Sequence, residues 1–142
     1  MKFSVSNIGL TEYSHSGELE QVKAIGFSGI EVAPSRVWRD VGVGLSSKDI
    51  QIYRQQVESA GLKTVGLHSL FFDQPNLGLF AKGELRERTL SYLVHLSKVC
   101  RDLGGKTLTY GGGRWRGKIP KNDAFNLAIE FLDDIIQKVK DH

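Results

Sequence analysis

Two residues combine a titratable side chain with a position where enzymes often bind substrates. His68 lies near the end of the apolar run KTVGLHSLFF (63–72), and Glu31 lies within the run GIEVA (29–33). Short apolar runs of this kind predict strands that are buried on both faces, as in parallel sheets covered by helices. Because α/β proteins bind ligands at the carboxyl ends of their strands, both side chains are candidate substrate contacts.

Each of these two candidates also has a purely structural interpretation. A histidine in a buried strand can be satisfied by backbone groups, and a carboxylate between apolar neighbours can be solvated or paired with another side chain. The sequence alone leaves both interpretations open for His68 and Glu31.

A further candidate site is the loop GGGRWRG (111–117), which follows the apolar run KTLTY (106–110). Consecutive glycines allow the backbone to approach a ligand closely, and arginine binds anions through paired hydrogen bonds. We therefore include Gly112, Arg114 and Arg116 among the candidate substrate-binding residues. The loop matches neither the P-loop nor the dinucleotide-binding fingerprint, because it lacks their residues and spacing. The alternative is a solvated loop in which a tryptophan packs on an arginine.

The elements that must position these residues follow a regular pattern. Strand-like runs are separated by segments with helical periodicity, and the runs are 2–8, 29–33, 63–72 and 106–110. Three of the predicted helices end in Gly26, Gly61 and Gly104, as expected where the backbone becomes left-handed after a helix. Regular alternation of strand and helix requires parallel strands joined by crossovers. The predicted fold class is therefore α/β, built from four parallel (β/α) repeats.

The predicted helices carry apolar stripes and recognisable ends. Ser46 and Asp49 are typical of a capping box at the start of the second helix. In the third helix Cys100 is expected to be a packed core thiol, and His95 a surface or hydrogen-bonded residue. The stripe predicted for the last helix is Phe125, Ala128, Phe131, Leu132, Ile135 and Val139.

Length and composition limit the classes of protein to consider. The chain has 142 residues, of which 40% are hydrophobic and 25% charged, as in ordinary globular domains. No fifth strand follows the last helix, so we expect a single (β/α)4 domain over residues 1–142 that is incomplete. The absence of a signal-like or membrane-spanning segment predicts a cytoplasmic protein without membrane contact. A net charge of +3 is too small to indicate nucleic-acid binding.

The resemblance to a known family rests on three segments, AIGFSGIEVAP (24–34), VESAGLKTVGLHSLFF (57–72) and LGGKTLTYGGGRWR (103–116). Together they resemble the N-terminal half of the xylose isomerase-like TIM barrels, which include sugar phosphate isomerases/epimerases and endonuclease IV-type enzymes. The resemblance covers nearly the whole chain but only about half of a family barrel. It implies half of a (β/α)8 barrel, so that the expected domain is a (β/α)4 half-barrel.

The resemblance also implies an activity. Family members use a divalent metal to isomerise or epimerise a sugar or hydroxy-carbonyl compound by proton transfer next to a carbonyl. By this likeness Glu31 and His68 face the barrel mouth and contact substrate, and residues 111–116 line it. The metal ligands of the family come mostly from strands five to eight, so we assign no metal ligand and no catalytic residue within this chain.

Two alternatives to a sugar isomerase remain open at this stage. An endonuclease IV-like DNA repair hydrolase would also carry a histidine on its third strand, but this chain has glycines where that group has a histidine after the fourth strand. A non-catalytic half-barrel would pair with another chain, either as a homodimer or by association through its open edges.

Overall fold

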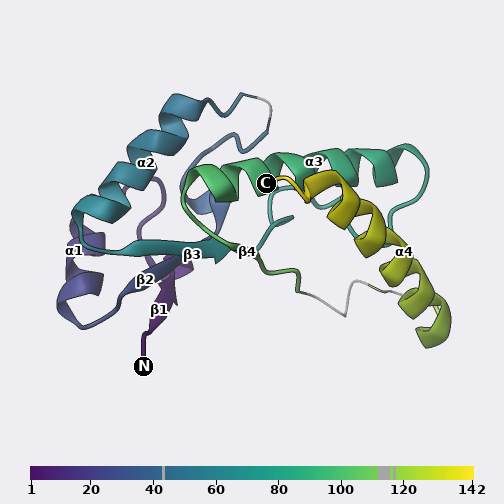
Figure 1. Cartoon of the computed structure of the whole chain (residues 1–142), viewed down its shortest axis with the longest axis horizontal. Helices are drawn as coiled ribbons and strands as arrows, with labels where there is room; N and C mark the ends of the chain where they lie inside the picture. The colour runs from purple at the N-terminus through teal and green to yellow at the C-terminus, as the bar shows by residue number, and fades with distance from the viewer. Residues whose placement is uncertain (43, 112–115, 117) are drawn as a thin grey trace.

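The computed structural model is an α/β fold with a four-stranded parallel sheet, and it describes residues 1–142 except 43, 112–115 and 117. The strands are β1 (Ser4–Ser6), β2 (Gly29–Val32), β3 (Lys63–Leu67) and β4 (Thr107–Leu108). The helices are α1 (Ser16–Ala24), α2 (Ser47–Ser59), α3 (Glu84–Asp102) and α4 (Lys121–Val139), with 3-10 helices η1 (Asn7–Gly9) and η2 (Pro34–Arg36). The strand order is β1-β2-β3-β4, so each strand lies beside the next one along the chain (Figure 1). The predicted α/β class with parallel (β/α) repeats is confirmed.

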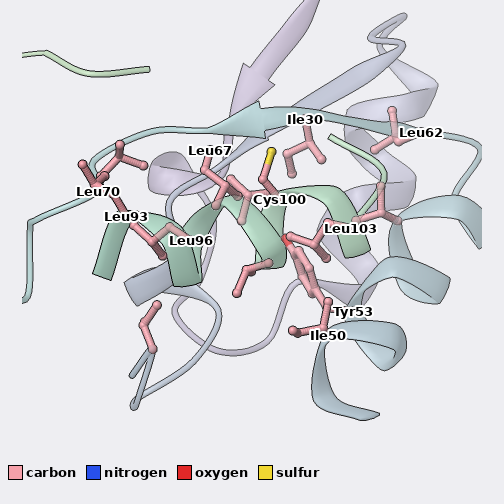
Figure 2. Close-up of a cluster of buried hydrophobic side chains, with 14 of the residues drawn as sticks. Ile30, Ile50, Tyr53, Leu62, Leu67, Leu70, Leu93, Leu96, Cys100 and Leu103 are labelled. Carbon is pink, nitrogen blue, oxygen red and sulfur yellow. The ribbon is translucent and has the colours of Figure 1, made fainter. Parts of the chain in front are cut away.

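The core lies between the sheet and helices α2 and α3. Ile30, Val32 and Leu67 are completely buried, and they pack with side chains from these helices (Figure 2). Cys100 of α3 belongs to the same cluster, and its thiol donates a hydrogen bond to the carbonyl of Thr107 at 3.5 Å. Burial raises the pKa of the Cys100 thiol. The predicted core position of this cysteine is confirmed.

Glycines end the first three helices as the sequence predicts. Gly26, Gly61 and Gly104 have φ angles of 102°, 75° and 81°, a region that other residues rarely adopt. At the other end of α2, the side chain of Ser46 accepts a hydrogen bond from the amide of Asp49, as predicted. His95 is also satisfied, since its Nε2 lies 2.7 Å from the carbonyl oxygen of Val41.

A buried amide side chain fixes the end of β1 against the end of β2. Asn7 is completely buried, its Nδ2 donates to the carbonyl of Ala33 at 3.2 Å, and its Oδ1 accepts from the amide of Ala33 at 2.7 Å. The side chain thus replaces one backbone pairing at the point where β1 turns into η1. This contact sets the position of the residues that immediately precede Asn7.

The strands are shorter than the apolar runs that predicted them. The run 63–72 continues as a strand only to Leu67, and Ser69 then takes a left-handed φ of 52°. Leu70 and Phe71 lie beyond this turn and pack against the core, which is why the apolar run continues past the end of the strand. Apolar character therefore reports burial here, and it does not separate a strand from the buried turn that follows it.

The stripe predicted for α4 is only partly buried. Phe131 and Ile135 are buried, but Phe125 and Leu132 are 65% and 39% exposed. The reason is that α4 crosses α3 at an angle and its N-terminal end points away from α3, so only part of the helix is covered (Figure 1). An ion pair between Arg86 of α3 and Asp134 of α4, at 2.5 Å, joins the two helices at the edge of this contact.

Replacement of Asn7 by Ala should lower the free energy of unfolding by about 1–3 kcal/mol, because it leaves the buried amide of Ala33 without the acceptor that Asn7 provides. Urea titration followed by circular dichroism measures this change. Asn126→Ala is the matched control, since Asn126 is exposed on α4 and should change stability by less than about 0.5 kcal/mol. Equal effects of the two substitutions would contradict the role given to Asn7.

Candidate functional site

The side of the sheet opposite the core carries the candidate polar residues. Val5 pairs with the buried Ile30, and Ser6 pairs with Glu31. Because neighbouring residues in a strand point to opposite faces, Ser6 and Glu31 lie on the face away from the helices. Ser4 lies on this face as well, where its hydroxyl donates to Oε1 of Glu31 at 3.4 Å. We call this side of the sheet the inner face.

His68 reaches the inner face from the end of β3. Its backbone amide donates to the carbonyl of Val32 at 3.0 Å, which extends the pairing of β2 and β3 by one residue. Its ring crosses toward β1, and Nε2 lies 2.8 Å from Oγ of Ser6. Nδ1 lies 3.1 Å from Oγ of Ser69. The structure therefore brings His68 and Glu31 to the same side and the same end of the sheet.

Burial and charge act on His68 in opposite directions. Partial burial lowers the pKa of His68 below 6.5, while the nearby carboxylate of Glu31 raises it, and burial has the larger effect. The ring is therefore neutral at pH 7. A neutral imidazole is both a donor and an acceptor of hydrogen bonds, which suits it to contact a sugar hydroxyl.

A groove of about 1020 Å³ opens beside His68. Its described lining comes from the segment between β3 and α3 and from the end of β4, and includes Phe71, Phe72, Gln74, Asn76, Phe80 and Tyr110. Phe71 packs edge-on against Tyr110 with ring centroids 5.5 Å apart, whereas Phe72 is 79% exposed. The groove thus combines aromatic surfaces with amide groups next to the histidine.

Of the arginine and glycine candidates, only Arg116 lies among the described residues. Arg116 is half-buried in the segment between β4 and α4, and its carbonyl accepts a hydrogen bond from Ile119. Within the described part of the chain, no hydrogen bond or ion pair connects the side chain of Arg116 to Glu31 or His68. Gly112 and Arg114 lie outside the described residues, so their role stays a prediction.

Three serines belong to the site without having been predicted. Ser4, Ser6 and Ser69 contact Glu31 or His68 directly. The alternation of Ser4 and Ser6 with apolar residues in β1 was the available signal, because it placed both hydroxyls on one face. No local pattern indicated Ser69, whose position depends on the turn after β3.

The geometry can now be compared with known proteins. Residues 19–142 match the family described as "Xylose isomerase-like TIM barrel". The chain belongs to this family. Its inner face is therefore the side that lines the barrel interior in a complete xylose isomerase-like TIM barrel, and the carboxyl ends of its strands form part of the mouth.

Solved structures with the same fold come from sugar enzymes. A D-psicose 3-epimerase from Clostridium cellulolyticum H10, solved with D-tagatose, is 14% identical with a TM-score of 0.72, over 99% of this chain and 49% of that chain. A sugar phosphate isomerase/epimerase from Parabacteroides distasonis ATCC 8503 is 18% identical with a TM-score of 0.66, over 96% of this chain and 50% of that chain. This chain thus spans about half the length of these structures, and at such identities they show the fold alone.

Two further comparisons are brief. No curated protein matches the sequence. Among the described residues, no helix has the length and apolar character needed to cross a membrane.

Members of the xylose isomerase-like family typically bind a divalent metal. Such an ion usually needs three or more carboxylate or histidine ligands gathered at one point. The described residues contain no group of three histidine, cysteine, aspartate or glutamate side chains with that arrangement. Glu31 and His68 therefore do not form a metal site by themselves, and we derive no chemical step through a metal from this chain.

Acidification should destabilise the protein through two histidines. Burial lowers the pKa of both His15 and His68 below 6.5, so the unfolded chain binds more protons than the folded chain at mildly acidic pH. The stabilisation that comes from the two neutral histidines is fully present above pH 6.5, the pKa of an unfolded histidine. It is lost as the pH falls through the lowered pKa values of the folded protein. We expect the free energy of unfolding to decrease between about pH 7 and pH 5, and to decrease less in the double variant His15→Gln, His68→Gln. Urea titrations at several pH values measure both slopes, and identical slopes would contradict the expectation.

Proposed function

We propose that this chain supplies the substrate-binding half of a sugar isomerase or epimerase, in which a proton moves next to the carbonyl of a small sugar or hydroxy-carbonyl substrate. The observation that carries the proposal is the grouping of Glu31 and His68 on the inner face, with His68 also lining an open groove, in a chain of the xylose isomerase-like family. The sugar enzymes with the same fold support it.

The residues suggest a division of roles around the substrate. The neutral ring of His68 hydrogen-bonds a substrate hydroxyl, and the carboxylate of Glu31 accepts hydrogen bonds that orient the sugar. Proton transfer between neighbouring carbons needs a base near the carbon and a group that stabilises the developing negative charge. Glu31 is the only carboxylate among the described strand residues, so we assign it to orientation and not to both tasks.

The groove beside His68 suits a polyhydroxylated ligand. Sugars present C–H groups that pack on aromatic rings and hydroxyls that bond to amides, and both kinds of partner line this groove. Phe72 is the aromatic residue with the most exposed ring there, and Gln74 and Asn76 are the nearby amides. These groups support the sugar-like class of substrate.

Sugar binding tests the proposal directly. D-fructose, D-tagatose and D-psicose should give saturation-transfer NMR signals with the chain, and His68→Ala should weaken binding about tenfold, because it removes one hydrogen-bonding partner of the sugar. Glu31→Gln should also weaken binding.

The control for this experiment is Glu20→Gln, which removes an exposed carboxylate from α1 and should leave binding unchanged. The absence of sugar binding to the unsubstituted chain would contradict the proposed function.

We also propose where this chain binds a partner. In the described sheet, β1 and β4 are edge strands, and the helix-facing Phe3 before β1 is 55% exposed. On α4, four exposed apolar residues repeat at intervals of four, three and four positions: Phe125, Ile129, Leu132 and Ile136. Single exposed apolar residues are ordinary, but a continuous stripe marks an association surface.

We assign a second copy of the chain to this surface. All strands are parallel, so β1 of one copy can extend the sheet beside β4 of another in the same direction. A twofold axis repeats this contact on the other side and closes the assembly. In that arrangement the stripe on α4 of each copy covers the exposed Phe3 beside β1 of the other.

If two copies associate in this way, size-exclusion chromatography with light scattering should measure the mass of a dimer. The double variant Ile129→Asp, Leu132→Asp places two charges in the stripe and should give a monomer, because burial of unpaired charge is unfavourable. Gln137→Asp adds a charge at an exposed position of α4 outside the stripe and serves as the control, with wild-type mass expected. A monomeric wild-type chain would contradict the proposed partner.

A further inference from the structure

The hydrogen bonds of His68 determine which ring nitrogen carries its proton. Both nitrogens have a serine partner, Ser6 at Nε2 and Ser69 at Nδ1, at 2.8 and 3.1 Å. A neutral imidazole has one N–H donor and one lone-pair acceptor, whereas a hydroxyl has one proton to give and two lone pairs that accept. A hydroxyl whose oxygen already accepts a hydrogen bond is the better donor to the ring, so the remaining contacts of the two serines favour one tautomer.

Ser6 already accepts one hydrogen bond from the backbone. Its Oγ caps η1 by accepting from the amide of Ile8 at 3.1 Å. Its own proton is free to be donated, and Nε2 of His68 is the acceptor that the described contacts provide. If Ser6 donates to Nε2, then Nε2 carries the lone pair and the ring proton lies on Nδ1.

Ser69 completes the same assignment from the other side of the ring. Its φ of 52° is a left-handed conformation that residues with a side chain rarely adopt. In this conformation Oγ lies within reach of Nδ1 and can accept a hydrogen bond from Nδ1–H. The strained turn after β3 is thus linked to the orientation of the histidine.

We propose that Ser6 and Ser69 are positioning residues that hold His68 as the neutral Nδ1–H tautomer, with the Nε2 lone pair directed toward the inner face. Nε2 then accepts a hydrogen bond from a substrate hydroxyl, which replaces the hydroxyl of Ser6. This last role rests on the proposed function. The tautomer itself is a property of the ligand-free chain, so the two statements can fail separately.

Nitrogen NMR tests the tautomer without any substrate. Long-range ¹H–¹⁵N spectra of the ¹⁵N-labelled chain, recorded at a pH above the pKa of His68, distinguish a protonated from an unprotonated ring nitrogen. The signals of His68 are identified by their loss in His68→Gln. We expect Nδ1 to be protonated and Nε2 to be unprotonated in the unsubstituted chain.

Substitution of Ser6 separates positioning from general structural support. Ser6→Ala removes the donor to Nε2 and should lower the ratio of Nδ1–H to Nε2–H by about tenfold, the effect of one hydrogen bond. Ser6→Thr keeps a hydroxyl and should retain the original tautomer. Ser4→Ala is the matched control, because Ser4 lies on the same face of β1 but bonds to Glu31.

The outcome in the unsubstituted chain is decisive by itself. A dominant Nε2–H tautomer there would overturn the proposal, even if a variant failed to fold. An unchanged tautomer ratio in folded Ser6→Ala would overturn the role of Ser6. If the tautomer is as proposed but no sugar binds, the positioning role stands and the proposed function fails.

Discussion

The burial of alternate strand residues against α2 and α3 is the constraint on which the site depends. Ile30, Val32 and Leu67 are completely buried on the helix-facing side of the sheet. Since a strand places neighbouring residues on opposite faces, this packing forces Glu31 to the other face, beside Ser6 of the adjacent strand. The position of the polar residues therefore follows from the apolar ones, and slippage of one residue in register would exchange the two sets.

Much of the fold could be predicted from the sequence because its signals are local. The glycines at positions 26, 61 and 104 end helices through their own backbone freedom, and Ser46 caps α2 through contacts three residues away. Alternating strands and helices then leave few topologies. The ends of the strands were predicted less well, because burial continues from Leu67 into the turn that holds Leu70.

Part of the candidate site could also be proposed from the sequence, although contact of its residues with a substrate stays a prediction. Glu31 and His68 were chosen because burial of a titratable group in an apolar strand is unfavourable unless the group is paired, solvated or bound to a ligand. Ser6 could not be joined to His68 from sequence, since 62 positions separate the two residues and their contact depends on strand order. The exposed half of the α4 stripe was also beyond sequence reasoning, because helical periodicity identifies apolar residues but does not say how many neighbours will cover them.

The single thiol of the chain gives the fold an internal marker. Cys100 lies under β4, its Sγ bonds to the carbonyl of Thr107, and burial raises its pKa, so the reactive thiolate is suppressed while the strand is in place. An alkylating reagent can reach the sulfur only when α3 and β4 separate. The rate at which Cys100 is alkylated therefore measures how often β4 detaches from α3. A strand of another chain that paired with β4 would slow this detachment.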